Sequence, residues 1–226
     1  MDVVLALPPH YRWIGARGWV LWFHGYKNFD TSMIYGLGEP MGKALLKSGY
    51  ILVGPDYRNN ACFGNAPCVD DIRRTVELAH SQLHLKRDPY CVGWSMGGII
   101  MLNSVAHGVV RCRAAEMVFP AYNLASIYAE GWPSFTDAIQ KGYGFHAADG
   151  YAAATAGYDP ALDAPSSFRS IPMDIHCSAT DVVLQCANNG EALAKKLGAK
   201  FTPCQGAHGD ASCIVPDAAV ALFKEH

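Results

Sequence analysis

The stretch DPYCVGWSMGGIIML, residues 88–102, sets one serine, Ser95, among glycines, with apolar residues on both sides. The run before the serine, 90–94, has the composition of a buried strand, and the apolar run 96–106 after it is typical of a helix. A serine at such a junction is either a nucleophile held on a sharp turn or a small polar residue in a glycine-rich corner. The two interpretations differ in what else the chain must contain, because a serine hydroxyl is a poor nucleophile without a base.

The glycines around Ser95 favour the first interpretation. GWSMG, residues 93–97, fits the pattern G-x-S-x-G, whose strained turn between strand and helix leaves no room for bulk two residues before and after the serine. Gly93 and Gly97 meet that need, and we expect Gly98 to allow close packing of the helix. Such a turn would lift the Ser95 hydroxyl above the carboxyl edge of a sheet.

The rest of the chain alternates strands with helices, which predicts an α/β protein with a mostly parallel sheet and helices on both faces. The apolar runs expected as strands lie at 18–23, 50–58, 90–94, 114–121, 171–180 and 199–206. The segments with helical spacing of apolar residues lie at 39–49, 69–83, 96–106, 188–198 and 216–225. Residues 121–168, rich in aromatic residues, alanine and glycine, break this rhythm. We interpret them as a cap or lid inserted into a single domain that spans 1–226.

Composition narrows the class of protein. A chain of 226 residues, 50% hydrophobic and 17% charged, suits one globular domain with a large core. A net charge of -2 without a basic tract gives no reason to expect nucleic acid or an anionic membrane surface as partner. The first apolar run, before Pro8, is too short to span a membrane and lacks the basic start of a signal peptide. We therefore expect a soluble protein that binds no nucleic acid and spans no membrane; its compartment and oligomeric state stay open.

Eight cysteines are many for an intracellular enzyme but too few for a disulfide scaffold. Cys62 and Cys68, in the loop ACFGNAPC, are the expected local disulfide. Cys91 and Cys177 lie in apolar runs and are expected to be small buried residues. A zinc site built from His24, His176 and nearby cysteines lacks the paired spacing of zinc ligands, so no metal is expected.

A base for Ser95 is available in the loop CQGAHGD, which follows the last expected strand. His208 in this loop would lie at the same sheet edge as the serine. His24, at the end of the first buried strand, and His176, inside a strand, are weaker candidates. The sequence therefore predicts His208 as the general base.

An acid must hold the imidazole in the correct tautomer, and Asp181 ends a strand at the same edge. The chain order Ser95, Asp181, His208 is the order of α/β-hydrolases. The other aspartates rank lower, because they lie inside a strand, two residues past His208, or in the insertion: Asp174, Asp210, Asp159 and Asp163.

Two backbone amides are expected to bind an oxyanion. Met96 begins the helix after Ser95, so its amide points to where the oxyanion would form. The loop WFHGYKNFD after the first buried strand supplies the second donor: Gly25 permits a tight path, and the amide of Tyr26 is the partner. The Tyr26 hydroxyl is an alternative donor.

Together, the segments HGY, PDYR, GWSMGG, SATD and GAHGD resemble a serine hydrolase of the α/β-hydrolase fold over nearly the whole chain. Within that superfamily, PDYRNNACFGNAPCVDDI and VGWSMGG are similar to prolyl-oligopeptidase-like catalytic domains and to acetyl-esterase and dienelactone-hydrolase-like proteins. Three departures matter: no β-propeller precedes the domain, HGY replaces the frequent HGG, and about 23 residues precede His24, so that one of two leading antiparallel strands is expected to be missing. Ester hydrolysis is therefore favoured over peptide hydrolysis.

The resemblance implies an acyl-enzyme on Ser95, a small-molecule ester as substrate and no cofactor. The aromatic residues of 121–168 are expected either to roof an apolar pocket or simply to pack the insertion onto the sheet. In the first case Trp94, Tyr122 and Trp132 would bind substrate. A peptidase, a thioesterase and a non-catalytic binding protein of the same fold remain alternatives.

Overall fold

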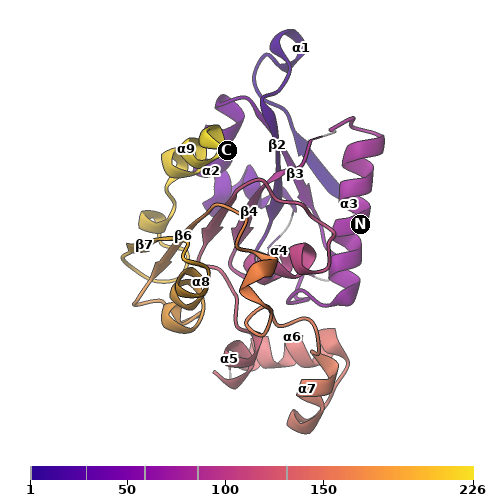
Figure 1. Cartoon of the computed structure of the whole chain (residues 1–226), viewed down its shortest axis with the longest axis vertical. Helices are drawn as coiled ribbons and strands as arrows, with labels where there is room; N and C mark the ends of the chain where they lie inside the picture. The colour runs from indigo at the N-terminus through magenta and orange to yellow at the C-terminus, as the bar shows by residue number, and fades with distance from the viewer. Residues whose placement is uncertain (1, 29, 59, 86, 131) are drawn as a thin grey trace.

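The computed structural model describes residues 2–28, 30–58, 60–85, 87–130 and 132–226, which form one seven-stranded sheet flanked by helices (Figure 1). The order of the strands across the sheet is β1-β3-β2-β4-β5-β6-β7. The strands are β1 (Val3–Ala6), β2 (Gly18–Phe23), β3 (Tyr50–Pro55), β4 (Tyr90–Trp94), β5 (Ala115–Val118), β6 (Met173–Ser178) and β7 (Lys200–Cys204).

All neighbouring strands are parallel except β1, which pairs antiparallel with β3. This confirms the expected α/β-hydrolase fold with a mostly parallel sheet. In the described residues, β1 is the one antiparallel strand of the sheet, as the short stretch before His24 predicted. β4, which ends next to Ser95, lies at the centre of the sheet and is buried along its whole length.

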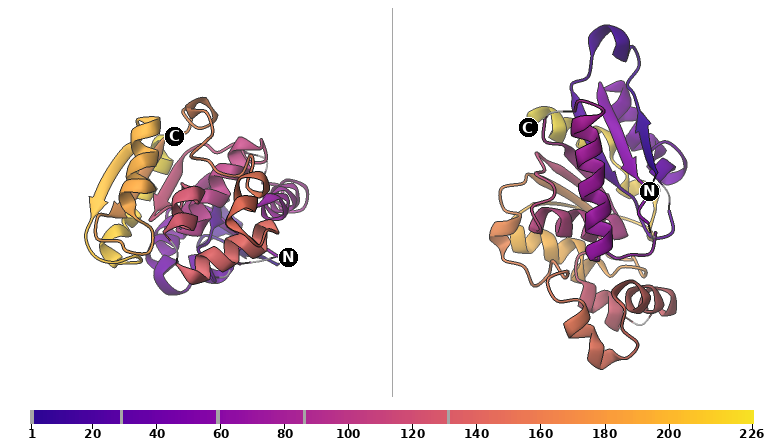
Figure 2. Two further views of the ribbon diagram at one scale, coloured as in Figure 1. Left: turned by 90° about the horizontal axis from the view of Figure 1, so that it is seen from below. Right: turned by 90° about the vertical axis from the view of Figure 1, so that its right-hand side faces the viewer.

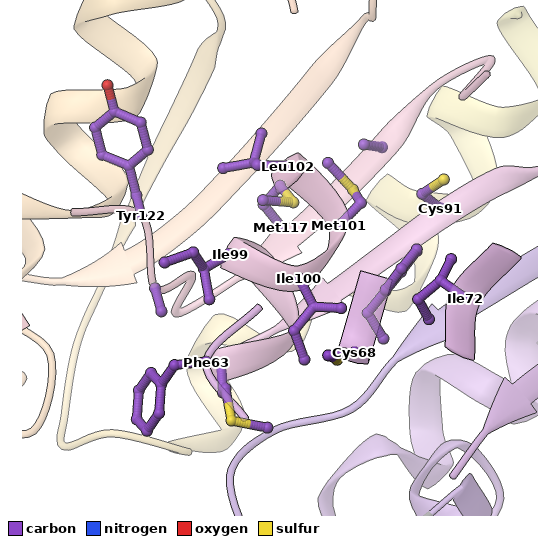
Figure 3. Close-up of a cluster of buried hydrophobic side chains, with 14 of the residues drawn as sticks. Phe63, Cys68, Ile72, Cys91, Ile99, Ile100, Met101, Leu102, Met117 and Tyr122 are labelled. Carbon is purple, nitrogen blue, oxygen red and sulfur yellow. The ribbon is translucent and has the colours of Figure 1, made fainter. Parts of the chain in front are cut away.

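Helices cover both faces of the sheet (Figure 2). Helices α3 (Ala66–Ser81), α4 (Met96–Ala106) and α8 (Gly190–Leu197) contribute to the core on one face, and α2 (Glu39–Lys47) and α9 (Pro216–Glu225) pack together on the other. The amphipathic helices form where apolar residues recur at helical spacing. Helix α4 is instead apolar all round and buried, with Ile99, Ile100 and Leu102 inside the core shown in Figure 3. Ser95 thus precedes a helix that is buried over most of its length.

The remaining helical segments are short. They are α1 (Tyr11–Ile14), η1 (Asp30–Met33), η2 (Gly36–Gly38), α5 (Leu124–Ala129), α6 (Pro133–Tyr143), η3 (Ala148–Gly150), α7 (Tyr151–Ala154), η4 (Pro165–Ser167), η5 (Cys186–Asn188) and η6 (Ala211–Cys213). No helix in the described part of the chain combines the length and the hydropathy that crossing a membrane requires.

The segment 121–168 holds α5, α6 and α7 and lies at the end of the molecule opposite α1 (Figure 1). The Asn189 side chain fixes its start, because Oδ1 accepts hydrogen bonds from the amides of Tyr122 (3.0 Å) and Asn123 (3.1 Å). Tyr128 stacks on Tyr151 with ring centroids 4.8 Å apart. These two aromatic residues therefore pack the segment against itself.

The expected disulfide between Cys62 and Cys68 is wrong. Both are buried free thiols, and the Cys68 thiol is hydrogen-bonded with that of Cys62. The disulfides join Cys177 with Cys186 and Cys204 with Cys213. Cys177 is buried as expected, but it forms a disulfide and is not a free thiol. The prediction failed because it considered only cysteines within one short loop and not pairs that close a loop around another residue.

Candidate active site

Ser95 occupies a strained turn between β4 and α4. Its φ of 50° and ψ of -121° lie outside the conformations that residues with a side chain prefer, which costs about 1–3 kcal/mol. The turn is held on both sides: the Ser95 amide donates to Val118 O (2.9 Å), and the Ser95 carbonyl accepts from the Ala121 amide (2.9 Å). The neighbouring strand β5 thus pins the serine in the conformation that G-x-S-x-G predicts.

The glycines make this turn possible by their lack of a side chain. A Cβ atom on Gly97 would overlap the carbonyl oxygen of Phe23, and one on Gly93 would lie 2.8 Å from the sulfur of Met117. A Cβ on Gly98 would come within 2.7 Å of Pro120, which confirms the expected close packing of the helix. The elbow is therefore fixed by contacts that no larger residue could allow.

His208 lies between Ser95 and Asp181. Its Nε2 is 2.9 Å from Ser95 Oγ, and its Nδ1 is 2.6 Å from Asp181 Oδ2. Because the Asp181 carboxylate only accepts, Nδ1 carries the proton, and Nε2 is left to accept from the serine hydroxyl. Asp181 is 4% exposed, and its Oδ1 accepts from the amides of Val183 (2.8 Å) and Leu184 (3.0 Å). The three residues form one hydrogen-bonded chain in the order expected from sequence.

Asp181 and His208 stand on two loops, and each loop is closed by a disulfide. Cys177–Cys186 encloses Asp181, and Cys204–Cys213 encloses His208. The two loops are also joined, because the Thr180 hydroxyl donates to the Gly206 carbonyl (2.8 Å). Sequence reasoning did not assign these four cysteines to the site; that both pairs are nine residues apart and each brackets a candidate residue is the signal that could have found them.

Within the described ranges of the chain, the amides of Met96 and Tyr26 beside Ser95 have no hydrogen-bond acceptor, and the same holds for the amide of Gly25. Met96 is the first residue of α4, where amides lack a partner inside the helix. The Tyr26 hydroxyl donates to Ser134 O (3.1 Å) in α6, so of the two donors of this residue the backbone amide is the one without an acceptor. That loop is close to the nucleophile, because a Cβ on Gly25 would be 3.2 Å from Ser95 Cβ.

The residues expected to bind substrate are dispersed. Trp94 is 5% exposed and lines a cavity of about 230 Å³ with Trp22, Asn28 and Leu37. Tyr122 is buried, with Lys196 Nζ 5.8 Å from its ring centroid, and Trp132 is 42% exposed at the start of α6. Neither is among the residues that line this cavity. Besides Trp22 and Trp94, its walls come from Asn28, Thr31, Ser32 and residues 35–38, which sequence reasoning passed over because they carry no strand or helix pattern.

Most of the lower-ranked residues have structural partners. The His24 ring stacks on Tyr57, with centroids 4.1 Å apart. Asp159 accepts from the Leu124 and Ala125 amides, both at 3.1 Å, and Asp210 accepts from the Ser212 amide (2.8 Å). For Asp163, burial raises its pKa.

His176 forms a buried cluster with Glu116 and Asp174 in strands β5 and β6. Its Nε2 lies 3.0 Å from Glu116 Oε1 and 3.3 Å from Asp174 Oδ1, and Lys200 pairs with the other oxygen of Asp174. Burial would lower the pKa of His176, but its hydrogen bonds and ion pairs with the two carboxylates raise it to about 9. Burial would also raise the pKa of Asp174, but His176 and Lys200 lower it to about 2. The ligand atoms lie within 4.8 Å of one another, as metal ligands would, yet two cations already balance the carboxylates.

The comparisons with known proteins concern the fold. No protein-family model and no curated protein matches the sequence. Many solved structures match the fold, among them an α/β-hydrolase superfamily protein from Enterococcus faecalis, with 11% identity and a TM-score of 0.74 over 99% of this chain and 95% of that one. The chain therefore has the α/β-hydrolase fold.

Two of the matching structures have named activities or ligands. FphF, a fluorophosphonate-binding serine hydrolase from Staphylococcus aureus, has 15% identity and a TM-score of 0.71 over 98% of this chain and 91% of that one. Est1E from Butyrivibrio proteoclasticus, solved with ferulic acid bound, has 14% identity and a TM-score of 0.72 over 99% of this chain and 94% of that one. At these identities the likeness is one of fold, and many of the neighbours are esterases.

Proposed function

We propose that the protein is a serine hydrolase that cleaves carboxylic esters of small molecules. The observation that carries the proposal is the hydrogen-bonded chain from Ser95 Oγ through His208 to the buried carboxylate of Asp181, with distances of 2.9 and 2.6 Å. A serine, a base and an orienting acid in this geometry are the requirements for nucleophilic catalysis by a hydroxyl.

In the first half of the proposed reaction, His208 Nε2 takes the proton of Ser95 as Oγ attacks the ester carbonyl carbon. The carbonyl π electrons move to oxygen, which becomes an oxyanion. When the intermediate collapses, the bond to the leaving oxygen breaks, and His208 returns its proton to the alcohol. An acyl-enzyme on Ser95 and a free alcohol result. Asp181 supports this half by keeping the proton on Nδ1 and by stabilising the imidazolium.

In the second half, water takes the place of the serine. His208 removes a proton from water as its oxygen attacks the acyl carbon, and the proton then returns to Ser95 Oγ as the carboxylic acid leaves. Every proton in this scheme is carried by His208, Ser95 or water, so the reaction needs no cofactor.

The amides of Met96 and Tyr26 are the donors for the oxyanion in both halves. Donors placed in advance cost no reorganisation during the reaction, and each is worth about 3 kcal/mol of barrier, or on the order of a hundredfold in rate. Both are backbone groups, so the test of their role is a change of loop path rather than a side-chain deletion. A Gly25→Val variant would push the loop away from Ser95 and should lower kcat while the protein stays folded.

The proposal is tested by labelling with a fluorophosphonate and by hydrolysis of short p-nitrophenyl esters. We expect the wild-type protein to be labelled, Ser95→Ala to lose labelling, and both Ser95→Ala and His208→Ala to lose hydrolysis by about 10⁴-fold or more. Matched controls are Ser81→Ala and His107→Ala, whose side chains bond the Glu77 and Gly157 carbonyls on the surface, and they should keep full activity.

Labelling that persists in Ser95→Ala, or a folded wild-type protein that neither labels nor hydrolyses esters, would contradict the proposal. Faster cleavage of proline anilides than of esters would assign the site to a peptidase instead.

A further inference from the structure

We propose that the cavity beside Ser95 binds one aromatic ring of the substrate, an inference that rests on the proposed ester hydrolysis. The cavity has a volume of about 230 Å³ and lies between the indoles of Trp22 and Trp94 and the turn formed by η1 and η2. Its volume, its walls and its position next to Ser95 each support this assignment.

The cavity borders the catalytic residues on two sides. A Cβ on Gly25 would lie 3.2 Å from Ser95 Cβ, 3.3 Å from Asn28 Nδ2 and 3.5 Å from Trp94 Cδ1, so two lining residues meet beside the nucleophile. On the other side, a Cβ on Gly209, which follows His208, would lie 3.1 Å from Leu37 Cδ1. A group held in the cavity is therefore within reach of an ester carbonyl placed at Ser95.

The walls suit a flat apolar group. Trp22 and Trp94 stack with ring centroids 6.2 Å apart and an angle of 21° between their planes, and both are at most 5% exposed. Tyr35 and Leu37 line the same cavity and are 66% and 55% exposed, which leaves apolar surface uncovered beside the site. Aromatic pairs contribute about 0.5–1.5 kcal/mol beyond the burial of area, a preference of about twofold to tenfold over a saturated ring of the same size.

The volume limits the group to one ring. Pockets for drug-sized ligands measure roughly 300–1,000 Å³, and this cavity is smaller. Its one amide side chain, Asn28, lies at the end next to Ser95, where the polar ester bond would be. Thr31 and Ser32 also line the cavity, so an ester with a single benzyl or phenyl group would place its ring against Trp22, Trp94 and Leu37 and its ester bond beside Asn28.

A second cavity, of about 480 Å³, lies against Tyr26 and α6 and is the competing place for the ring. It is lined by three charged side chains, those of Lys27, Asp137 and Lys141. Charged walls disfavour an unsubstituted ring, because burial against them removes water from the charges without pairing them. The aromatic group is therefore assigned to the first cavity.

The binding test uses full-length Ser95→Ala protein, so that its result does not depend on turnover. The probes are benzyl alcohol and cyclohexylmethanol, which share the same polar group; the saturated ring is the more hydrophobic of the two. We expect calorimetry to give about twofold to tenfold tighter binding of benzyl alcohol. Leu37→Ala, added to Ser95→Ala, should weaken the binding of benzyl alcohol by about tenfold. This corresponds to the loss of contact with fewer than two methylene groups.

The matched control is Leu162→Ala, since Leu162 is 83% exposed in the segment 121–168 and lines neither cavity. It should leave both affinities unchanged. Tighter binding of cyclohexylmethanol, or binding that responds to Lys141→Ala and not to Leu37→Ala, would overturn the inference.

Kinetics with active protein separate this inference from the proposed function. Benzyl acetate and cyclohexylmethyl acetate have leaving alcohols of similar reactivity, because a methylene group insulates each ring from the ester. We expect a higher kcat/KM for benzyl acetate and a rise in its KM in Leu37→Ala. Hydrolysis of both acetates at equal rates, with no ring preference in binding, would sink the aromatic assignment and leave the esterase intact. Ring-selective binding without any Ser95-dependent hydrolysis would sink the esterase and leave a binding site.

Discussion

Removing the disulfide around His208, with the double variant Cys204→Ala and Cys213→Ala, should lower both stability and turnover. The two cysteines are nine residues apart, so the bond closes a loop of about ten residues in the unfolded chain. The entropy of closing such a loop corresponds to about 2.7 kcal/mol at 25 °C. We therefore expect the free energy of unfolding to fall by about that amount, measured by urea denaturation with tryptophan fluorescence.

The effect on turnover follows from what else holds the loop. After the bond is removed, the Ser212 hydroxyl still donates to Gln205 O (2.6 Å), and the Thr180 hydroxyl still donates to Gly206 O (2.8 Å). The ring of His208 also remains against Phe119, with centroids 5.0 Å apart. A displacement of about 1 Å in a catalytic group costs on the order of a hundredfold, and these contacts limit the displacement. We expect kcat for a p-nitrophenyl ester to fall by about tenfold, with a small change in KM.

A reductant should reproduce both losses in the wild-type protein, and any further loss that it causes in the double variant reports on the remaining disulfide, Cys177–Cys186, around Asp181. Cys112→Ser, which alters a half-buried free thiol, is the matched control and should keep wild-type kcat. If kcat of the double variant equals that of the wild type while its stability falls, the disulfide stabilises the fold without positioning His208. If the free energy of unfolding is also unchanged, the loop-closure reasoning itself fails.

Three further changes test other parts of the fold and the site. Gly97→Ala should destabilise the protein by about 2 kcal/mol or more and abolish hydrolysis, because the new methyl group overlaps Phe23 O; urea denaturation and kcat measure both. The raised pKa of His176, about 9 against an ordinary 6.5, stabilises the fold by up to about 3 kcal/mol below pH 6.5, and this contribution should disappear as the pH rises from 6.5 through about 9 in urea titrations. Asn189→Ala should cost about 2–3 kcal/mol of unfolding free energy, because two backbone amides lose their acceptor.

Each of these changes has a control. Gly142→Ala should be neutral or stabilising, because its Cβ would lie no closer than 3.4 Å to any neighbour and helix α6 would gain an alanine. His176→Asn should flatten the alkaline part of the stability profile, and an unchanged slope would remove His176 as its source. Asn188→Ala, which removes an exposed side chain, should leave the free energy of unfolding unchanged. If Asn188→Ala lowers it as much as Asn189→Ala does, the loss comes from the start of helix α8 and not from the two hydrogen bonds that Asn189 Oδ1 accepts.

The parts of the fold that were predictable from sequence depend on short-range rules. Alternating apolar runs and helical spacing gave the six strands from β2 to β7 and the five longer helices that flank the sheet, because each pattern needs only its own segment to be recognised. The chain order of Ser95, Asp181 and His208 followed in the same way, since the carboxyl ends of parallel strands meet at one edge. Contact between them, across 113 and 27 positions, is what the structure adds.

The parts that sequence reasoning missed depend on contacts that loops make with other parts of the chain. Cys62 and Cys68 are close in the chain and in space, yet both remain thiols, whereas Cys204 finds its partner beyond His208. The cavity walls formed by Asn28, Thr31, Ser32 and residues 35–38 were missed for a related reason. The short 3-10 helices η1 and η2 have no repeating pattern of apolar residues. The sequence therefore gave no sign that Leu37 lies against the loop of His208.

Backbone contacts hold the turn of Ser95, whereas a disulfide closes the loop of His208. This difference matches the positions of β4 and β7 in the sheet. Ser95 follows β4, which lies in the middle of the sheet and is buried along its length, so backbone contacts alone can hold a strained turn there. His208 follows β7, an edge strand with a largely exposed or half-buried surface, where few packed neighbours surround the loop. A covalent bond that closes this loop supplies the restraint that packing supplies at β4. His208 and Asp181, whose loops are both closed by disulfides, should consequently respond to a reductant, whereas Ser95 should keep its conformation.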